Sequence, residues 1–161
     1  MKVGILSDTH DDREAVVRAV DLFNRRGVEM VIHAGDCESP ATVELLGELL
    51  CPFTGVYGNC DAHLQLRGGP WIGGDLHRQP LRVSLGDKKA VVVHQHHRVE
   101  ELAAVGAFDI VIYGHLHVPD VRRVGKTLVI NPGKTARQRQ DRSTVALLDT
   151  ESLDVEIVDL Y

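Results

Sequence analysis

The chain has 161 residues, of which 43% are hydrophobic and 25% are charged. This length and composition fit one globular domain over residues 1–161 with a substantial buried core. The net charge of −5, without a long basic stripe, argues against a protein whose function is to bind nucleic acid. The densest basic stretch, 137–142, is diluted by glutamines and one aspartate, and we expect a solvated loop there.

The start of the chain and its cysteines indicate the compartment. The apolar run within the first ten residues is too short for a signal peptide, and no run approaches the roughly 18 apolar residues that a membrane helix needs. Three cysteines are an odd number that forms no disulfide framework, which agrees with a reducing environment. We therefore expect a cytoplasmic protein without a membrane segment.

The first half of the chain alternates buried strands with helices. Apolar runs and helical spacing predict a strand at 2–7, a helix at 12–26, a strand at 30–34, a helix from Ser39–Pro40 to about Leu49, and a strand at 53–57. Gly27 is expected to end the first helix, and Ser39 and Pro40 fit the N-cap and first position of the second. The segment 62–78, with two Gly-Gly pairs and Trp71, is predicted to be a long irregular loop.

The second half of the chain contains two predicted hairpins. The pattern predicts strands at 81–85 and 89–93, a helix at about 99–105, and strands at 110–113, 121–124, 127–130, 144–148 and 155–160. Gly86–Asp87 and Gly125–Lys126 are expected to be the hairpin turns. Strand–helix–strand units followed by hairpins predict an α/β fold with mixed sheets covered by helices.

Polar side chains follow five of the predicted strands. These are Asp8 and His10, then Asp36, then Asn59, Cys60 and Asp61, then His94, His96 and His97, and finally His115 and His117. In open α/β sheets the carboxyl ends of parallel strands share one edge, where sites form. We therefore expect these side chains to converge there.

A subset of these side chains, made of two aspartates, one asparagine and four histidines, contains too many metal ligands for one tetrahedral ion. They suit two divalent metals that share a bridging carboxylate. Nitrogen and oxygen ligands without thiolate favour Mn, Fe, Zn, Co or Ni over Ca or Mg. Two dications, two carboxylates and one hydroxide leave a charge of about +1, which would attract a phosphate group and activate a water.

The ordered motifs "SDTH", "AGD", "GNCD", "VHQH" and "GHLH", with "NPG" downstream, resemble the calcineurin-like metallophosphoesterases. Among these, the chain is most similar to the short bacterial and archaeal phosphodiesterases. The resemblance implies a four-layer αββα sandwich of two mixed β-sheets flanked by helices. It also implies that Asp8, His10 and His117 hold one metal, that Asn59, His94 and His115 hold the other, and that Asp36 bridges both. We expect manganese as the bound metal, ahead of Ni, Fe, Co and Zn.

The chain departs from the family at three places. Cys60 stands where larger relatives have a histidine that helps the leaving group, a pattern that resembles diesterases more than efficient monoesterases. "VHQHH" has Gln95 where short relatives commonly have glycine, and it adds His97, so either His96 or His97 could face the site. Lys134 follows "NPG" and either reaches a substrate phosphate or is solvated. The candidate catalytic residues are Asp36, Asn59, His96 and Cys60.

Other polar residues have simpler interpretations. His33 is expected to pack in the core or behind the ligands, and Cys37 and Cys51 to be inert. Asp61 either supports the metal asparagine or is a turn residue. His63 and His77 are expected to be exposed, and Trp71 could belong to a lid over the substrate or to a contact in a homo-oligomer.

We therefore predict a phosphodiesterase that uses a metal-activated water on a small phosphodiester, with nucleic acid expected only as a substrate. The alternatives are a non-catalytic scaffold of the same fold, similar to the small subunit of retromer, or a nuclease or phosphomonoesterase. "GKT" at 133–135 resembles a phosphate-binding P-loop, but Leu128 stands where that motif requires glycine. Pro132 also removes a backbone donor, so we reject a nucleoside triphosphatase.

Overall fold

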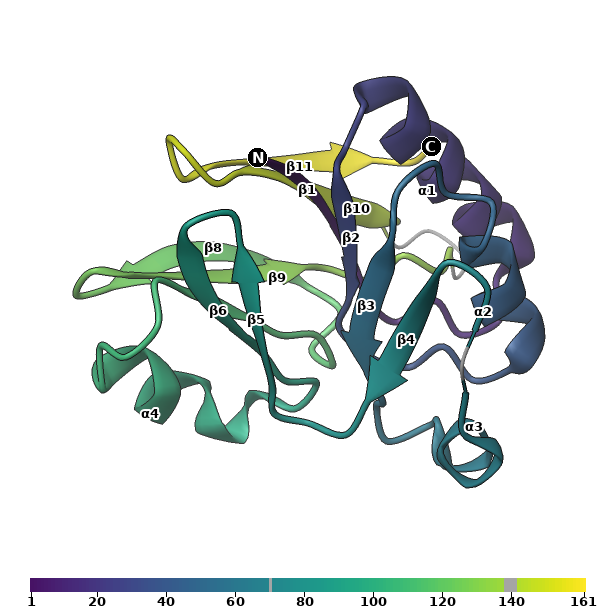
Figure 1. The fold of residues 1–161 in the computed structure, drawn as a ribbon, viewed down its shortest axis with the longest axis horizontal. Helices are drawn as coiled ribbons and strands as arrows, with labels where there is room; N and C mark the ends of the chain where they lie inside the picture. Colours follow the sequence, from purple (N-terminus) through teal and green to yellow (C-terminus); the bar gives the residue numbers. More distant parts are fainter. Residues whose placement is uncertain (70, 138–141) are drawn as a thin grey trace.

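A computed structural model describes residues 1–69, 71–137 and 142–161. Two β-sheets face each other, and helices cover the outer face of each sheet (Figure 1). The predicted four-layer αββα arrangement of mixed sheets is confirmed. Of the basic stretch 137–142, residues 138–141 lie outside the described residues.

The first sheet has six strands in the order β11-β10-β1-β2-β3-β4. Their bounds are β1 Lys2–Leu6, β2 Met30–His33, β3 Phe53–Val56, β4 Gly74–His77, β10 Thr144–Asp149 and β11 Asp154–Asp159. Strands β1 to β4 run parallel to one another, and β10 and β11 complete the sheet with antiparallel pairing. The carboxyl ends of β1, β2 and β3 therefore lie along one edge.

The second sheet has five strands in the order β5-β6-β7-β9-β8. Their bounds are β5 Leu81–Leu85, β6 Lys88–Val92, β7 Ile110–Ile112, β8 Pro119–Val124 and β9 Thr127–Pro132. The central strands β6, β7 and β9 are parallel, whereas β5 and β8 pair antiparallel as the two predicted hairpins.

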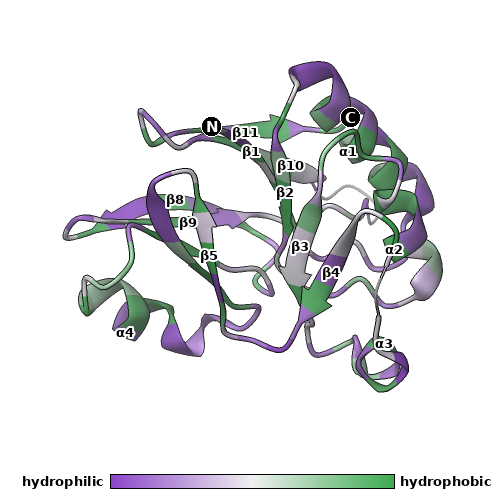
Figure 2. Ribbon diagram, viewed as in Figure 1, coloured by the Kyte–Doolittle hydropathy of each residue, from purple (hydrophilic) through white to green (hydrophobic). Residues whose placement is uncertain are grey.

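The helices are α1 Arg13–Arg26, α2 Pro40–Leu46, α3 Ala62–Arg67, a 3₁₀ turn η1 His96–Arg98, and α4 Val99–Ala104. The sequence specifies α1 well. Asp12 accepts a hydrogen bond from the backbone N–H of Ala15 at 3.1 Å, and Gly27 adopts φ 62° just beyond the helix. Figure 2 shows both hydrophobic and hydrophilic residues along α1, as expected for a helix with one buried face.

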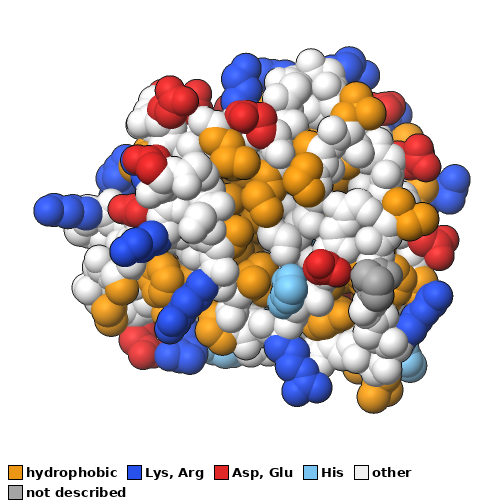
Figure 3. All heavy atoms as spheres, viewed as in Figure 1, with side chains coloured by type: hydrophobic (Ala, Val, Ile, Leu, Met, Phe, Trp, Pro, Cys, Tyr) orange, Lys and Arg blue, Asp and Glu red, His pale blue; other side chains and the backbone are white. Residues whose placement is uncertain are grey.

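Three buried clusters hold the layers together. The first lies between α1, α2 and the first sheet and includes Phe23 and Leu46; the second lies between the two sheets; the third lies between α4 and the second sheet. On the face seen in Figure 3, hydrophobic side chains gather along the middle, in the region between the sheets, with charged side chains around them. Burial of the apolar side chains of the three clusters is the main source of stability.

The segment 62–78 is not a single irregular loop, and this prediction was wrong. It contains α3 and β4, and His63 and His77 are exposed on them as expected. The helix is too short and β4 too exposed at the sheet edge for a periodic pattern to appear. Gly74 suggests a loop in the sequence, but a Cβ there would lie 2.0 Å from the carbonyl oxygen of Phe53, so glycine permits the strand pairing.

The second helix also differs from its prediction. It ends at Leu46 rather than near Leu49, and Ser39 occupies the N-cap position without a capping hydrogen bond from its side chain. The Ser39 hydroxyl instead donates to Asp11 at 2.6 Å, as does the hydroxyl of Thr42 at 2.7 Å. These contacts tie α2 to the loop that follows β1.

Candidate functional site

The polar residues that follow β1, β2, β3, β6 and β7 meet at one edge of the two sheets, as predicted. Asp8, His10 and His117 form one group. His117 Nε2 lies 3.1 Å from Asp8 Oδ1, and His10 Nε2 lies 3.8 Å from the same oxygen. The two imidazole Nε2 atoms are 3.3 Å apart. Residues more than 100 positions apart in the chain are thus brought into direct contact.

Asp36, Asn59, His94 and His115 form a second group. His94 Nε2 lies 2.9 Å from Asn59 Oδ1 and 3.3 Å from Asp36 Oδ2. The His115 ring stands edge-on to the His94 ring, with centroids 5.1 Å apart. All seven residues predicted as metal ligands therefore belong to one of the two groups.

Asp36 connects the two groups. Its Oδ2 atom lies 3.3 Å from His94 Nε2 and 4.0 Å from His10 Nε2. Its Oδ1 atom accepts a hydrogen bond from the Cys60 backbone N–H at 2.8 Å, which fixes the carboxylate. One oxygen of Asp36 therefore faces imidazoles of both groups.

The backbone at this edge is strained. In the described part of the chain, eight non-glycine residues have φ between 40° and 74°, and all except Leu153 lie here; the seven are Asp8, His10, Asp11, Asp36, Glu38, His115 and His117. This left-handed conformation is unfavourable for residues with a Cβ and concentrates at functional sites. Gly58 permits the close approach of two loops, because a Cβ there would lie 2.1 Å from Asp36 Oδ1.

Hydrogen bonds behind the groups orient the imidazole rings. His94 Nδ1 donates to the carbonyl oxygen of Ala34 at 2.8 Å, and His10 Nδ1 donates to the carboxylate of Glu38 at 2.6 Å. Each bond leaves Nε2 directed at the centre of the site. Such partners fix the tautomer and increase the basicity of a metal-binding histidine.

The charges of the site shift several pKa values. Burial alone would raise the pKa of Asp36, but hydrogen bonds from His94 and from the backbone of Cys60 hold that pKa well below its usual range. Burial opposes the charge of His94, yet the contact with Asp36 raises the pKa of His94 overall. Burial and the neighbouring His94 lower the pKa of His115. Partial desolvation and the charge of Asp36 raise the pKa of the Cys60 thiol to about 11.

The donor atoms fit divalent cations. Asp8 is fully buried, and its Oδ1 atom has no hydrogen-bond partner among the described residues, although two imidazoles face it. A buried carboxylate oxygen without a partner is unfavourable unless a cation compensates it. Three-residue sets at this edge have ligand atoms that all lie within 4.8 Å of one another, namely Asp8 with His10 and His117, and Asp8 with Asp36 and His94.

The structure shows which of His96 and His97 faces the site, a question that the sequence left open. The His96 ring stacks on the His115 ring, with centroids 5.7 Å apart and an interplanar angle of 14°. His97 is exposed on the outer side of His96. His96 is therefore the one beside the ligand groups. Lys134 is buried, which excludes the solvated one of its two predicted alternatives.

Asp61 and Glu38 are the residues whose contributions the sequence did not define. Asp61 is fully buried, and its carboxylate accepts backbone N–H bonds from Asp36 at 2.9 Å, Glu38 at 2.7 Å and Gly58 at 2.7 Å. It therefore supports the loop of Asp36 and Glu38 and the residue before Asn59, rather than Asn59 itself, which was one of its two predicted alternatives. Its place in "GNCD" was the only available signal, and nothing in the sequence indicated the contact of the half-buried Glu38 with His10.

The remaining candidates pack behind the site. His33 is fully buried, its Nδ1 accepts the Gly35 N–H at 3.0 Å, and burial lowers its pKa to about 4. Cys37 lies 3.3 Å from His33 Nε2, and all three cysteines are free. The prediction that His33 packs in the core or behind the ligands is confirmed by its burial.

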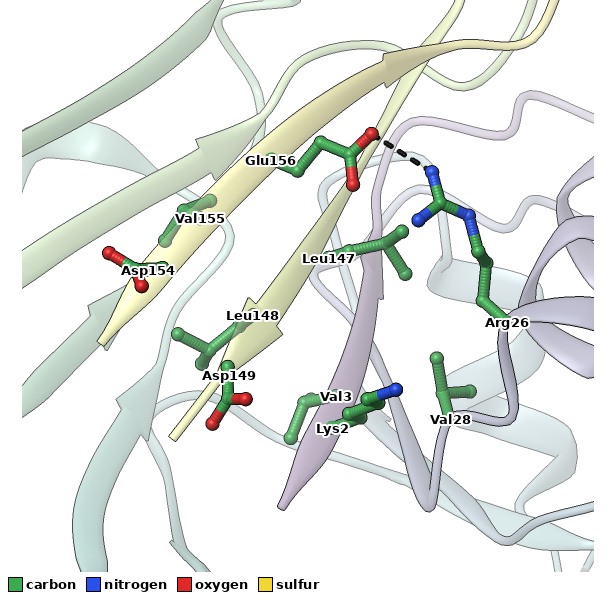
Figure 4. A pocket seen from close by; sticks show the side chains of 10 residues that line it. All are labelled: Lys2, Val3, Arg26, Val28, Leu147, Leu148, Asp149, Asp154, Val155 and Glu156. Carbon is green, nitrogen blue, oxygen red and sulfur yellow. Dashed lines mark hydrogen bonds and ion pairs between the residues drawn. The ribbon is translucent and has the colours of Figure 1, made fainter. Parts of the chain in front are cut away.

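A separate hollow lies at the end of β1 opposite to the ligand groups. It has a volume of about 280 Å³, and Figure 4 shows Lys2, Arg26 and Glu156 among its lining residues, with Arg26 paired to Glu156 at 2.9 Å. Lys2 begins β1, whereas the ligand groups follow its carboxyl end. None of the candidate site residues lines this hollow.

The sandwich of two mixed sheets carries, at one edge, histidines and carboxylates that could hold metal ions. The domain of the calcineurin-like phosphoesterase superfamily matches residues 1–153. The chain is 34% identical over 158 residues to a phosphodiesterase of Methanocaldococcus jannaschii, with 94% of each chain covered. A solved archaeal phosphodiesterase aligns with a TM-score of 0.88 and 33% identity over 99% of both chains.

The chain therefore belongs to the calcineurin-like phosphoesterase superfamily, as its motifs predicted, and by family it is a phosphoric ester hydrolase. Vacuolar Protein Sorting 29 of Cryptosporidium parvum aligns with a TM-score of 0.71 at 17% identity, over 98% of this chain and 96% of that one. This likeness extends to the fold alone. None of the helices in the described part of the chain has both the length and the apolar character needed to span a membrane.

Proposed function

We propose that this protein is a dinuclear metal-dependent phosphodiesterase. Asp8, His10 and His117 would hold one ion, Asn59, His94 and His115 the other, and Asp36 both. The observation that carries the proposal is the position of Asp36 Oδ2, which lies within 4.0 Å of an imidazole nitrogen of each group. The partnerless, buried oxygen of Asp8 supports the same assignment.

Manganese is the first choice of metal, with Ni, Fe, Co and Zn as alternatives, because the donor set combines imidazole with carboxylate and amide oxygen. When bound, two such ions supply a water of lowered pKa and a positive surface for the phosphoryl oxygens. The contribution of the chain is to hold the ligands in place before substrate arrives. The left-handed backbone conformations and the bonds from His94 to Ala34 and from His10 to Glu38 fix this geometry.

His96 and Cys60 act on the substrate side of the site. His96 lies against His115, where its imidazole neutralises charge on the phosphate or on the leaving group. Cys60 is exposed beside Asp36 and Asn59, and a neutral thiol brings no positive charge to this position, unlike the histidine of the larger relatives. A monoester presents a dianion and needs an added cation at this position more than a diester does. The neutral thiol therefore favours small phosphodiesters.

The fold shared with Vacuolar Protein Sorting 29 keeps a scaffold function as the second candidate. All seven ligand positions are filled in this chain, and they converge, which favours the enzyme. A nuclease or phosphomonoesterase is a weaker alternative, given the net charge of −5 and the thiol at position 60. We further propose that residues 1–161 form one domain and that the protein is cytoplasmic. A homo-oligomer is a candidate for its assembly state.

A substrate panel tests the proposal. The purified protein is loaded in turn with Mn, Ni, Co, Zn and Mg, and assayed with matched aryl phosphodiesters and monoesters. We expect diester hydrolysis with at least one transition metal, a lower rate on monoesters, and loss of activity on chelation. A protein that binds metal and hydrolyses no diester with any of the five ions is a scaffold.

A further inference from the structure

His10, Glu38 and Cys60 form a third set of metal-ligand types, here called the Cys60 site, at the rim of the two ligand groups. One ligand atom from each of these side chains lies within 4.8 Å of the other two. The carboxylate of Glu38 is 2.6 Å from Nδ1 of His10, and Cys60 follows Asn59 in the loop after β3. The Cys60 site differs from the two ligand groups in chemistry, because one of its ligand atoms is sulfur.

The backbone holds the Cys60 site together. The N–H of Cys60 donates to Asp36 Oδ1 at 2.8 Å, and the N–H of Glu38 donates to Asp61 Oδ1 at 2.7 Å. Glu38 has φ 74°, the most positive value among the non-glycine residues described. Such a conformation is costly for a residue with a Cβ and persists where the surroundings enforce it. Two of the three ligands are therefore fixed before an ion arrives, which lowers the entropic cost of binding.

The ligand types of the Cys60 site suit zinc. Thiolate, imidazole and carboxylate are the three kinds of side chain that bind this ion, and three protein ligands leave the fourth tetrahedral position to a water. A thiolate selects softer ions over manganese, which prefers oxygen ligands. The Cys60 site is thus expected to prefer a different metal from the two ligand groups.

An ion can reach the Cys60 site from solvent. Cys60 is exposed, and the side chain of Glu38 is 36% exposed. The negative charges of Asp36, Glu38 and Asp61 act on the thiol. These charges oppose a free thiolate but attract a cation, and a thiol that coordinates a metal gives up its proton. Binding of zinc therefore forms one sulfur–zinc bond and releases the thiol proton to solvent.

We propose that His10, Glu38 and Cys60 bind a zinc ion that inhibits the enzyme. His10 also belongs to the first ligand group, where its Nε2 lies 3.8 Å from Asp8 Oδ1. An ion at the Cys60 site competes with that group for the imidazole, so hydrolysis falls as the site fills. The inhibition rests on the proposed phosphodiesterase function, whereas the binding of zinc does not.

Cadmium tests the Cys60 site directly, because it binds the same ligands as zinc and a cadmium thiolate absorbs ultraviolet light by charge transfer. Cadmium is added to the manganese-loaded protein, and the absorption band is recorded. We expect a band that excess zinc removes and that Cys60→Ser abolishes. Glu38→Gln should weaken cadmium binding by about 10- to 100-fold. Cys51→Ser is the matched control and should keep the band, since Cys51 belongs to none of the three-residue sets among the described residues.

Hydrolysis of bis(4-nitrophenyl) phosphate is measured on the same samples, and each protein is compared with its own rate without cadmium. We expect the rate to fall as the band grows in the wild type and in Cys51→Ser, and to fall much less in Cys60→Ser. Equal inhibition of Cys60→Ser and the wild type overturns the proposal, since it places the inhibiting cadmium in the two ligand groups.

The absorption band separates this inference from the proposed function. If the protein hydrolyses no diester, the function fails, and a band that depends on both Cys60 and Glu38 still supports the zinc site. A wild-type protein without the band, a band that persists in Cys60→Ser, or unchanged cadmium affinity in Glu38→Gln overturns the zinc site whatever the activity.

Discussion

Replacing Asp61 with asparagine removes the charge that joins the loops after β2 and β3. In the structure, Asp61 Oδ2 accepts the N–H groups of Asp36 and Gly58, and Oδ1 accepts that of Glu38. An asparagine oxygen in the place of Oδ2 retains two of these bonds without the charge, and its NH₂ group then faces the N–H of Glu38. One lost bond to a charged acceptor and two weakened bonds amount to about 2–5 kcal/mol.

We expect the free energy of unfolding of Asp61→Asn to fall by that amount in urea denaturation monitored by circular dichroism. We also expect fewer metal ions per chain by elemental analysis, because Asp36 keeps its left-handed conformation, with φ 61°, through this contact. Asp21→Asn, an exposed aspartate of α1, is the control and should change neither quantity. An Asp61→Asn protein with the unfolding midpoint and metal content of the wild type would refute the reasoning.

Three further predictions concern the ligands, the thiol and the buried histidine. Asp36→Asn should lose more metal by elemental analysis than Asn59→Ala or His115→Ala, and full metal retention would show that Asp36 is not shared. Cys60→His should raise the ratio of monoesterase to diesterase kcat/KM about tenfold or more; an unchanged ratio with intact metal content would contradict the role of the thiol. His33 has a folded-state pKa of about 4 against 6.5 when unfolded, so the unfolded chain takes up the proton first. Stability should therefore fall by on the order of 3 kcal/mol between pH 6.5 and 4, and pH-dependent urea melts of His33→Gln should show a smaller fall.

The sequence predicted most of the fold because long apolar runs and one amphipathic helix dominate it. Part of the convergence was predictable for a related reason: β1 and β2 are parallel neighbours, so Asp8 and Asp36 had to lie near one another. His94 follows β6 in the second sheet, and the packing of the two sheets brings it to the same edge. Short elements were not predicted. Helix α3 has six residues and buries only Leu64, so its sequence contains no helical repeat of apolar residues. The edge strand β4 buries only Leu76.

The loop contacts could not be predicted. The role of Asp61 depends on how the loops after β2 and β3 approach each other, and a local pattern contains no such information. The same holds for His96 and His97, because the start of η1 rotates one ring onto His115 and the other toward solvent. The contact of Glu38 with His10 joins residues 28 positions apart.

The dependence of turnover on the number of manganese ions bound per chain tests the central claim most directly. Metal-free protein is titrated with manganese, and bound metal and the hydrolysis of bis(4-nitrophenyl) phosphate are measured on the same samples. We predict that turnover reaches its maximum at two bound ions per chain. Turnover that reaches its maximum at one ion per chain, or two bound ions without turnover, would contradict a dinuclear phosphodiesterase.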